Sequence, residues 1–290
     1  MNKPAAEIAL SVADVRELLS AQHAQLAQLP ITAGPSGWDN MIFRLGDAMA
    51  VRLPRRQSAA QLLEHEQHWL PQLQRQLPLP IPAPICIGLP SGSFPWNWSV
   101  TPWFEGETLD RSPPAADHAD LLASFLQALH TPAPAAAPHN PWRCVPLSQR
   151  QTRFEECVQD FKTRHGALDA KLLRFWEQAV QTPIDMAPTW IHGDLHARNV
   201  LVRDGRLSAV IDWGDMAAGD RAVDLAATWM LLPRADDRER VMSQCQAVTT
   251  QTWTRARGWA LLHALIVLRS GDPEHRAPGQ VTLSRLCEGP

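Results

Sequence analysis

One segment of this 290-residue chain concentrates the residue types that can handle phosphate and a hard metal ion. It contains His192-Gly-Asp194, then Asn199, and after Asp204-Gly205 it reaches Ile211-Asp-Trp-Gly-Asp215. The Asp-Gly dipeptide is typical of a two-residue hairpin turn. The pattern therefore predicts strands over 199–203 and 206–212.

The register of that predicted hairpin brings two oxygen ligands together. Asn199 would lie opposite Val210 and diagonal to Asp212 on one face, with Cα atoms roughly 7–8 Å apart. Two oxygen ligands at that separation can hold Mg²⁺. Asp194 lies on the loop just before the hairpin, so its carboxylate would reach the same place. Phosphoryl transfer uses this arrangement, with a metal on the phosphates and an Asp that orients a hydroxyl and accepts its proton.

The elements that must position these residues change in character near residues 104–106. Alternating apolar residues predict strands in the first third, and apolar residues at helical spacing predict a mostly helical remainder. We therefore expect an α+β, two-lobe protein. The predicted elements are a helix over 11–29 with a capping-box-like start at Ser11 and Asp14, a hairpin over 41–45 and 49–53, a helix capped by Ser58, an extended proline-rich connector over 78–84, strands over 85–87 and 98–104, and helices over 121–129 and 168–180.

Composition excludes several classes of protein. The formal net charge of −3 argues against a nucleic-acid binder, and no apolar run is long enough to span a membrane. From the acidic residues near the N-terminus we expect no secretory signal, and the five scattered cysteines fit reduced thiols in a cytoplasm. Lysine occurs only at positions 3, 162 and 171 and tyrosine not at all, so no catalytic Lys between 4 and 161 and no catalytic Tyr is possible.

The His-Gly-Asp-(four residues)-Asn and Asp-Trp-Gly motifs resemble the catalytic and metal loops of the aminoglycoside phosphotransferase-like family, small-molecule kinases related to protein kinases. The resemblance spans roughly residues 30–232. It implies a bilobal protein-kinase-like fold, with a small antiparallel sheet and one helix in an N-lobe (1–104) and a mostly helical C-lobe (105–290). The family places an Asp like Asp224 where it braces the catalytic loop.

The resemblance also implies a role for each matching residue. Asp194 would be catalytic, and Asn199 with Asp212 would bind Mg²⁺. The nucleotide would be held by Gly37, Asp39 and Asn40 in a phosphate-covering loop, by Arg52 paired with Glu66, and by the backbone of Trp103 and Phe104 at the adenine. Kinases use a strand Lys where this chain has Arg52, and Arg can bind phosphate through two hydrogen bonds.

The implied activity is ATP- or GTP-dependent phosphorylation of a hydroxyl on a small molecule, and the expected acceptor is an aminoglycoside- or macrolide-type antibiotic. Residues 107–290 contain 22 acidic and 20 basic residues, which does not support a strongly anionic pocket for polycationic aminoglycosides. The Trp-rich helices near the C-terminus suit a more apolar antibiotic such as a macrolide. A metabolite kinase (choline, homoserine or thiosugar type) and a non-catalytic nucleotide-binding scaffold remain alternatives. The expected partners are a nucleotide and an acceptor, with no nucleic acid or membrane, in a monomer or homodimer.

Other enzyme classes fit the sequence poorly. Asp194-x-His196 is reminiscent of dinuclear metallophosphoesterases, but their further His and Asn-His ligands are missing. His65 and His68 lack the spacing of a zinc protease, and neither a Walker A motif nor a serine-nucleophile elbow occurs. The segment after Asp215 is too short for a protein-kinase activation loop. We interpret His192 as a packed, hydrogen-bonded support, and His196 as ordinary structure.

Overall fold

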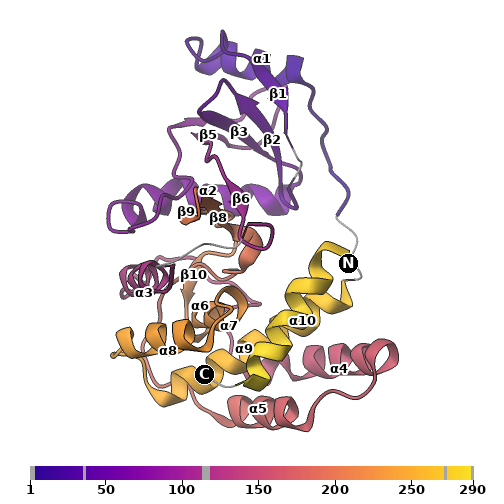
Figure 1. Cartoon of the computed structure of the whole chain (residues 1–290). Coiled ribbons are helices and arrows are strands. Elements are labelled where there is room, and N and C mark those ends of the chain that lie inside the picture. The colour runs from indigo at the N-terminus through magenta and orange to yellow at the C-terminus, as the bar shows by residue number, and fades with distance from the viewer. Residues whose placement is uncertain (1–3, 35–36, 113–117, 271–272, 289–290) are drawn as a thin grey trace. The chain divides into compact units, whose positions relative to one another are not determined.

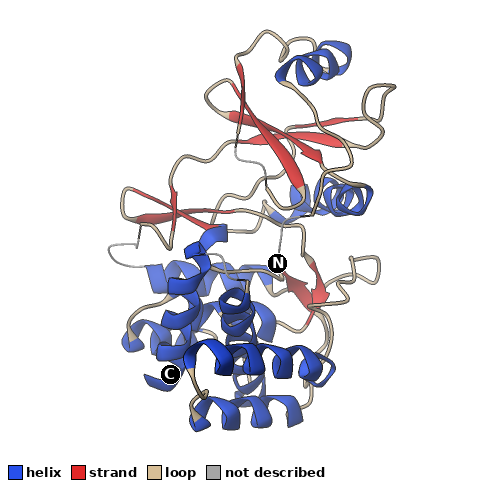
Figure 2. Ribbon diagram, turned by 90° about the vertical axis from the view of Figure 1, so that its right-hand side faces the viewer, coloured by secondary structure: helices blue, strands red, loops and turns tan. Residues whose placement is uncertain are grey.

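The structure, a computed structural model, describes residues 4–34, 37–112, 118–270 and 273–288. These residues form two compact units. The sheet unit comprises residues 4–106 and 208–214, and the helical unit comprises 107–207 and 215–288. Strands dominate the first unit and helices the second (Figures 1 and 2), which confirms the predicted α+β class.

The sheet unit is built on five antiparallel strands in the order β1-β2-β3-β5-β4. Its core lies between the sheet and α1, while α2 packs against β3 and β5. The elements are α1 (Val12–Gln22), β1 (Ile31–Ala33), β2 (Asn40–Leu45), β3 (Met49–Pro54), α2 (Gln57–Leu73), β4 (Cys86–Gly88) and β5 (Trp98–Pro102).

The central hairpin follows the predicted alternation. Phe43 pairs with Val51, and both side chains enter the core, as the period of two in this segment requires. Gly46 in the connecting turn has φ +58°, a conformation that glycine adopts without strain. The strands β2 and β3 thus confirm the predicted hairpin over 41–45 and 49–53.

Both helix starts in this unit are set by carboxylates. In α1, Ser11 and Asp14 form the predicted capping box, with reciprocal side chain to backbone hydrogen bonds of 2.7 and 3.3 Å. The predicted extension of this helix to residue 29 is wrong, because the helix ends at Gln22 and turns follow. The predicted Ser58 cap is also wrong: α2 begins at Gln57, whose backbone N–H donates to Glu7 at 3.0 Å.

The helical unit is organised around α9. This long helix contacts five others, α4, α5, α6, α7 and α10, and its inward face is almost entirely buried. The helices are α3 (His118–Leu129), α4 (Gln151–His165), α5 (Ala170–Gln181), α6 (Ala222–Leu225), α7 (Ala227–Leu231), α8 (Ala235–Gln244), α9 (Thr250–Arg269) and α10 (Pro273–Glu288), with 3-10 turns η1 (Leu147–Arg150) and η2 (Ala197–Asn199). Among the described residues, no helix is both long and apolar enough to cross a membrane.

Short strands frame the segment that carries the motifs. Strand β7 (Thr189–Ile191) pairs with β10 (Ala217–Gly219), and β6 (Glu107–Thr108), β8 (Val200–Arg203) and β9 (Arg206–Val210) form a second small sheet. Asp204 and Gly205 both have positive φ, as the predicted two-residue hairpin turn requires. The catalytic-type loop therefore runs from the end of β7 to the start of β8.

Candidate active site

The loop after β7 is fixed by one buried carboxylate. Asp224, at 0% exposure, accepts hydrogen bonds from the backbone N–H groups of His192 at 2.7 Å and Gly193 at 2.9 Å. His130 approaches the same carboxylate at 3.3 Å. The expected brace is therefore present, and it orients the loop that precedes Asp194. His192 is fully buried, and its ring accepts from the backbone N–H of Asp194 at 3.2 Å, which matches the support role expected for it.

Gly193 has no tolerable substitute at its position in this loop. Its φ is +84°, and a Cβ there would lie 2.5 Å from the backbone oxygen of Asp215. The positive φ disfavours every residue other than glycine, and the short distance from a Cβ to the Asp215 oxygen excludes any side chain unless the backbone moves. The glycine in the His-Gly-Asp motif is thus a packing requirement of the segment around Asp215.

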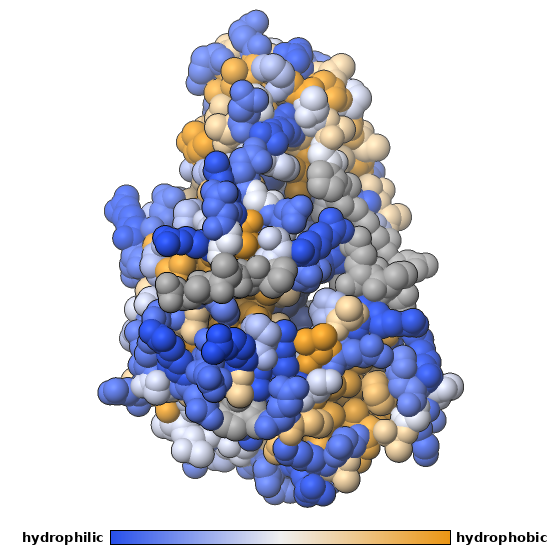
Figure 3. Space-filling view, in the orientation of Figure 1, coloured by the Kyte–Doolittle hydropathy of each residue, from blue (hydrophilic) through white to orange (hydrophobic). Residues whose placement is uncertain are grey.

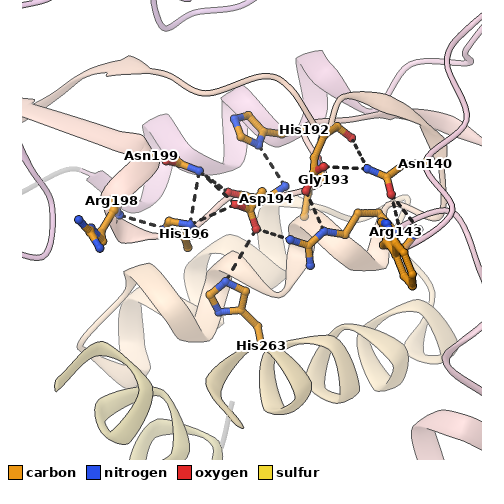
Figure 4. A network of polar contacts seen from close by, with 12 residues as sticks. Asn140, Arg143, His192, Gly193, Asp194, His196, Arg198, Asn199 and His263 are labelled. Carbon is orange, nitrogen blue, oxygen red and sulfur yellow. Dashed lines mark hydrogen bonds and ion pairs between the residues drawn. The ribbon is translucent and has the colours of Figure 1, made fainter. Parts of the chain in front are cut away.

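Asp194 is held from several sides (Figure 4). Arg143 donates to Oδ1 at 2.5 Å, His196 Nε2 lies 3.2 Å from Oδ2, and His263 on α9 lies 3.9 Å from Oδ1. Burial on its own would raise the pKa of Asp194, but Arg143, then His196 and His263, outweigh it and hold the pKa well below its usual value. The carboxylate is therefore ionised at neutral pH.

Arg143 is a site residue that sequence reasoning missed. Its Nε donates to Asp215 at 3.1 Å, and Asn140 donates to the same carboxylate at 2.9 Å. Asn140 also accepts from the backbone N–H of Arg143 at 3.1 Å. Burial would lower the pKa of Arg143, and the two carboxylates reverse that effect and raise it. Arg143 lies 51 residues before Asp194 in a loop with no recognisable motif, so no signal in the sequence pointed to it.

Asn199 lies beside Asp194 as predicted, although on a different element. It ends the 3-10 turn η2 and precedes β8, so the prediction that it is a strand residue is wrong. Its Nδ2 donates to the backbone oxygen of Asp194 at 2.9 Å. This bond commits the nitrogen of the buried amide and leaves its oxygen as the group able to bind a metal ion.

In the sheet unit, Arg52 and Glu66 form the predicted pair. Both are buried, and the guanidinium makes two hydrogen bonds to the carboxylate, one of them at 3.0 Å. Arg52 lies on the face of β3 opposite the core residue Val51, where α2 presents Glu66. Burial would lower the pKa of Arg52, but Glu66, then Asp212 and Asp39, outweigh it and raise the pKa.

Asp212 follows the end of β9 in a strained conformation. Its φ is +62°, which is uncommon for a residue other than glycine and is often found at functional sites. The predicted strand ended here, but β9 ends at Val210, so the ladder position predicted for Asp212 is wrong. The next residue, Trp213, is fully buried and donates to the Val210 backbone oxygen at 3.0 Å, which fixes this turn. Asp212 belongs to the sheet unit with Arg52, on which its charge acts.

The predicted phosphate-covering loop is tied to the start of α2. Asp39 forms an ion pair with Arg56 at 2.5 Å, and its backbone oxygen accepts from Arg55 at 2.9 Å. Asn40 is buried at the start of β2, and its side-chain oxygen has no hydrogen-bond partner among the described residues. Gly37 lies just before them, whereas residues 35–36 of the loop are outside the described residues.

The segment predicted to contact adenine lies beyond β5. The backbone N–H of Trp103 donates to Ala48 at 2.8 Å, so that group is not available to a base. The Trp103 carbonyl and the backbone of Phe104 remain as candidates. Arg44 covers the Trp103 ring, with its guanidinium carbon 4.9 Å from the ring centroid.

The structure thus brings the predicted residues into two groups. Asp194 and Asn199 lie together in the helical unit, joined by Arg143, His196 and His263. Arg52, Glu66, Asp212 and Asp39 lie together in the sheet unit. The Asn199 amide oxygen in the helical unit and the Asp212 carboxylate in the sheet unit are each hard oxygen donors, the kind of ligand that Mg²⁺ prefers. An ionised carboxylate, oxygen ligands and a fixed arginine are the parts of a kinase-like phosphotransferase.

Comparison with known proteins places the chain among the phosphotransferases. The phosphotransferase enzyme family (APH) matches residues 30–259, and the chain belongs to this family. It is therefore a small-molecule phosphotransferase, as its motifs indicated. A curated thiamine kinase of Escherichia coli (strain SMS-3-5 / SECEC) is 26% identical over 267 residues, covering 90% of this chain and 87% of the relative.

Solved structures confirm the kinase-like fold. The GDP complex of wild-type aminoglycoside 2'-phosphotransferase-IIIa aligns with a TM-score of 0.67 at 19% identity, over 96% of this chain and 99% of that one. Macrolide 2'-phosphotransferase type I aligns with a TM-score of 0.58 at 21% identity, over 95% and 98% of the two chains.

Proposed function

We propose that this protein transfers the γ-phosphoryl group of ATP or GTP to a hydroxyl of a small molecule, with Asp194 as the residue that orients the acceptor. The observation that carries the proposal is the geometry of Asp194. It is an ionised carboxylate on a loop that Asp224 fixes, next to the Asn199 amide.

The reaction assigns one task to Asp194. Its carboxylate accepts a hydrogen bond from the acceptor hydroxyl and takes the proton as the new oxygen–phosphorus bond forms. The bond from the γ-phosphorus to the bridging oxygen breaks, and the nucleoside diphosphate leaves with that electron pair. A carboxylate with a lowered pKa is a weak base, so Asp194 contributes chiefly by orienting the hydroxyl.

The nucleotide would be held by the residues of the sheet unit. Arg52, fixed by Glu66, would bind the α/β-phosphates, with Gly37, Asp39 and Asn40 beside them and the Trp103–Phe104 backbone at the base. Asn199 and Asp212 would hold Mg²⁺, which neutralises phosphate charge. Support comes from the bidentate Arg52–Glu66 pair and from the nucleotide in the aligned GDP complex.

The acceptor is the open part of the proposal. The aligned antibiotic phosphotransferases favour an aminoglycoside- or macrolide-type acceptor. A metabolite alcohol is the second candidate, because the thiamine kinase matches over 90% of this chain. We place the enzyme in the cytoplasm, where ATP, GTP and Mg²⁺ are available and where its five free cysteines would stay reduced.

The test is Mg²⁺-dependent release of ADP and GDP across aminoglycosides, macrolides and small metabolite alcohols, with Asp194→Asn as the control. We expect acceptor-dependent release that the variant loses, while nucleotide still raises its melting temperature. Equal turnover in the variant would refute the role of Asp194. Stabilisation by nucleotide without turnover of any acceptor would favour a binding scaffold.

A further inference from the structure

A pocket next to Asp194 lies wholly within the helical unit. It has a volume of about 210 Å³, smaller than the roughly 300–1,000 Å³ of pockets that hold drug-sized ligands. Its lining comes from the two loops that carry Arg143 and Asp194, from η2, and from α7, α9 and α10. A pocket of this size beside the candidate catalytic carboxylate suits a compact acceptor.

The charged groups that line the pocket are mostly basic. Arg143, Arg198, His196 and His263 face a single lining carboxylate, that of Asp194. Figure 4 shows Asp194 between Arg143 on one side and His196 with Arg198 on the other. A polyammonium ligand entering here would meet two permanent positive charges.

The one carboxylate is also already paired. Arg143 lies 2.5 Å from Oδ1 of Asp194, and His196 lies 3.2 Å from Oδ2. The nearby carboxylate of Asp215 accepts from Arg143 and Asn140 in the same way. A cationic group that binds either carboxylate would have to displace these partners.

The remainder of the pocket is apolar. Ile266 and Val267 of α9 line it together with Met230 of α7 and Pro278 of α10. The surface in Figure 3 is mainly hydrophilic, and apolar residues gather over part of the helical unit. A ligand that fits must therefore combine an apolar body with its polar groups.

We infer, on the basis of the proposed function, that the acceptor is a compact alcohol with an apolar body and an anionic group such as a carboxylate. Its hydroxyl meets Asp194, its apolar part packs on Ile266 and Val267, and its anion pairs with Arg198. Arg198 lines the same pocket from η2, where its backbone N–H donates to His196 at 3.2 Å. The same lining discriminates against polycationic acceptors, so among the acceptors considered above it disfavours the aminoglycoside type.

The test uses three alcohols that share a hydroxymethylbenzene body and carry an anionic, a neutral or a cationic group: 4-(hydroxymethyl)benzoate, its uncharged carboxamide and 4-(hydroxymethyl)benzylamine. Binding to the whole protein is measured by calorimetry, and phosphorylation by ADP and GDP release. We expect the carboxylate to bind best and the amine worst, with at least about a tenfold difference between them, as a charged hydrogen bond would give.

Two charge-reversal variants test whether the preference for the carboxylate depends on Arg198. Arg198→Glu should reduce the preference for the carboxylate by about tenfold or more. Arg203→Glu makes the same charge change at an exposed position of β8, outside the pocket lining, and should leave the preference unchanged.

The outcomes separate this inference from the proposed function. An amine or carboxamide that binds as well as the carboxylate, no binding of the carboxylate, or an equal effect of both reversals would overturn the anionic acceptor. If the carboxylate binds best but no alcohol of any charge gives release that depends on Asp194, the phosphotransferase role fails while the pocket chemistry holds.

Discussion

Asp194 keeps its negative charge because Arg143, His196 and His263 surround its carboxylate. Arg143 and His263 come from distant parts of the chain, and Arg143 is held in turn by Asn140. The properties of the candidate catalytic residue therefore depend on residues outside its own motif. This dependence can be tested at single positions.

The first test concerns the protonation of Asp194. Arg143→Gln removes the largest of the effects that lower the pKa of this carboxyl, so the pKa rises toward its ordinary value. Activity needs the ionised form, and the acidic limb of the kcat/KM profile should therefore move to higher pH. Profiles measured for both proteins from about pH 4 to 8 will show this shift. An unchanged acidic limb with reduced activity would mean that Arg143 acts only as a structural contact.

The second test concerns Gly193. Gly193→Ala adds a Cβ that would lie 2.5 Å from the Asp215 backbone oxygen, at a φ of +84°. We expect a loss of about 2 kcal/mol in unfolding free energy, and a fall in kcat of about a hundredfold because the next residue is displaced.

Gly166 offers a matched control for that change. It has φ +89° at the end of α4, but nothing lies within 4 Å of the Cβ that an alanine would add. Gly166→Ala should therefore cost only the strain of its backbone conformation, about 1–2 kcal/mol of stability, and leave kcat unchanged. Equal loss of kcat in both variants would contradict the role of the Gly193–Asp215 contact.

At the scale of elements, regular structure was predictable and irregular structure was not. The β2–β3 hairpin follows from alternation, which is a local property of the chain. Asn199 and Asp212 were predicted as strand neighbours, but one lies in a 3-10 turn and the other at φ +62°. Their residue types indicated the chemistry, while their backbone depends on tertiary contacts that periodicity does not report.

Arg143 also could not be predicted from sequence periodicity, because its contact joins residues that are far apart in the chain. Its contact with Asp194 joins segments 51 residues apart, and its own loop has no periodic pattern. Asp224 was identified because the family resemblance supplied its role, and the structure then showed the two backbone groups that it binds.

One element-level contact joins α9 to the segment before β7. Arg255 of α9 binds Asp220 at 2.6 Å and Asp185 at 2.8 Å. Burial opposes ionisation of Asp185, but bonds from Thr249, Arg255 and Thr252 lower its pKa to about 2. A carboxylate with a lowered pKa in the folded state stabilises the fold above its ordinary pKa of 3.8, and this contribution disappears as pH falls toward 2.

Asp185→Asn should therefore destabilise the protein at pH 7 by about 1–2 kcal/mol, since solvent at the rim weakens the pair. The difference from the unchanged protein should shrink as the pH falls through 4 toward about 2. Urea unfolding at several pH values measures it. Asp160→Asn removes an exposed pair with Arg164 and should cost no more than about 0.5 kcal/mol. If the two proteins differed in unfolding free energy by the same amount at every pH, the lowered pKa of Asp185 would not be a source of stability.

At the scale of the whole molecule, the candidate ligands divide between two compact units. The sheet unit holds Arg52 and Glu66, and the helical unit holds Asp194 and its pocket. Donor binding and acceptor binding should therefore respond to different substitutions. Such a division would explain how one fold accepts different alcohols while keeping one phosphate donor.

The division predicts that substitutions in the two units differ in their effect on nucleotide binding. Arg52→Ala removes the proposed phosphate contact and should weaken nucleotide binding by about tenfold or more, and Arg52→Lys, which keeps the charge but loses the bidentate geometry, should weaken it less. Asp194→Asn should bind nucleotide normally and lose turnover. Calorimetry with the non-hydrolysable analogue of each nucleotide provides the measurement, after circular dichroism has shown that each variant is folded. Equal affinities for the Ala and Lys variants would mean that Arg52 supports Glu66 and the sheet but does not touch phosphate, because a direct phosphate contact must respond to the loss of charge.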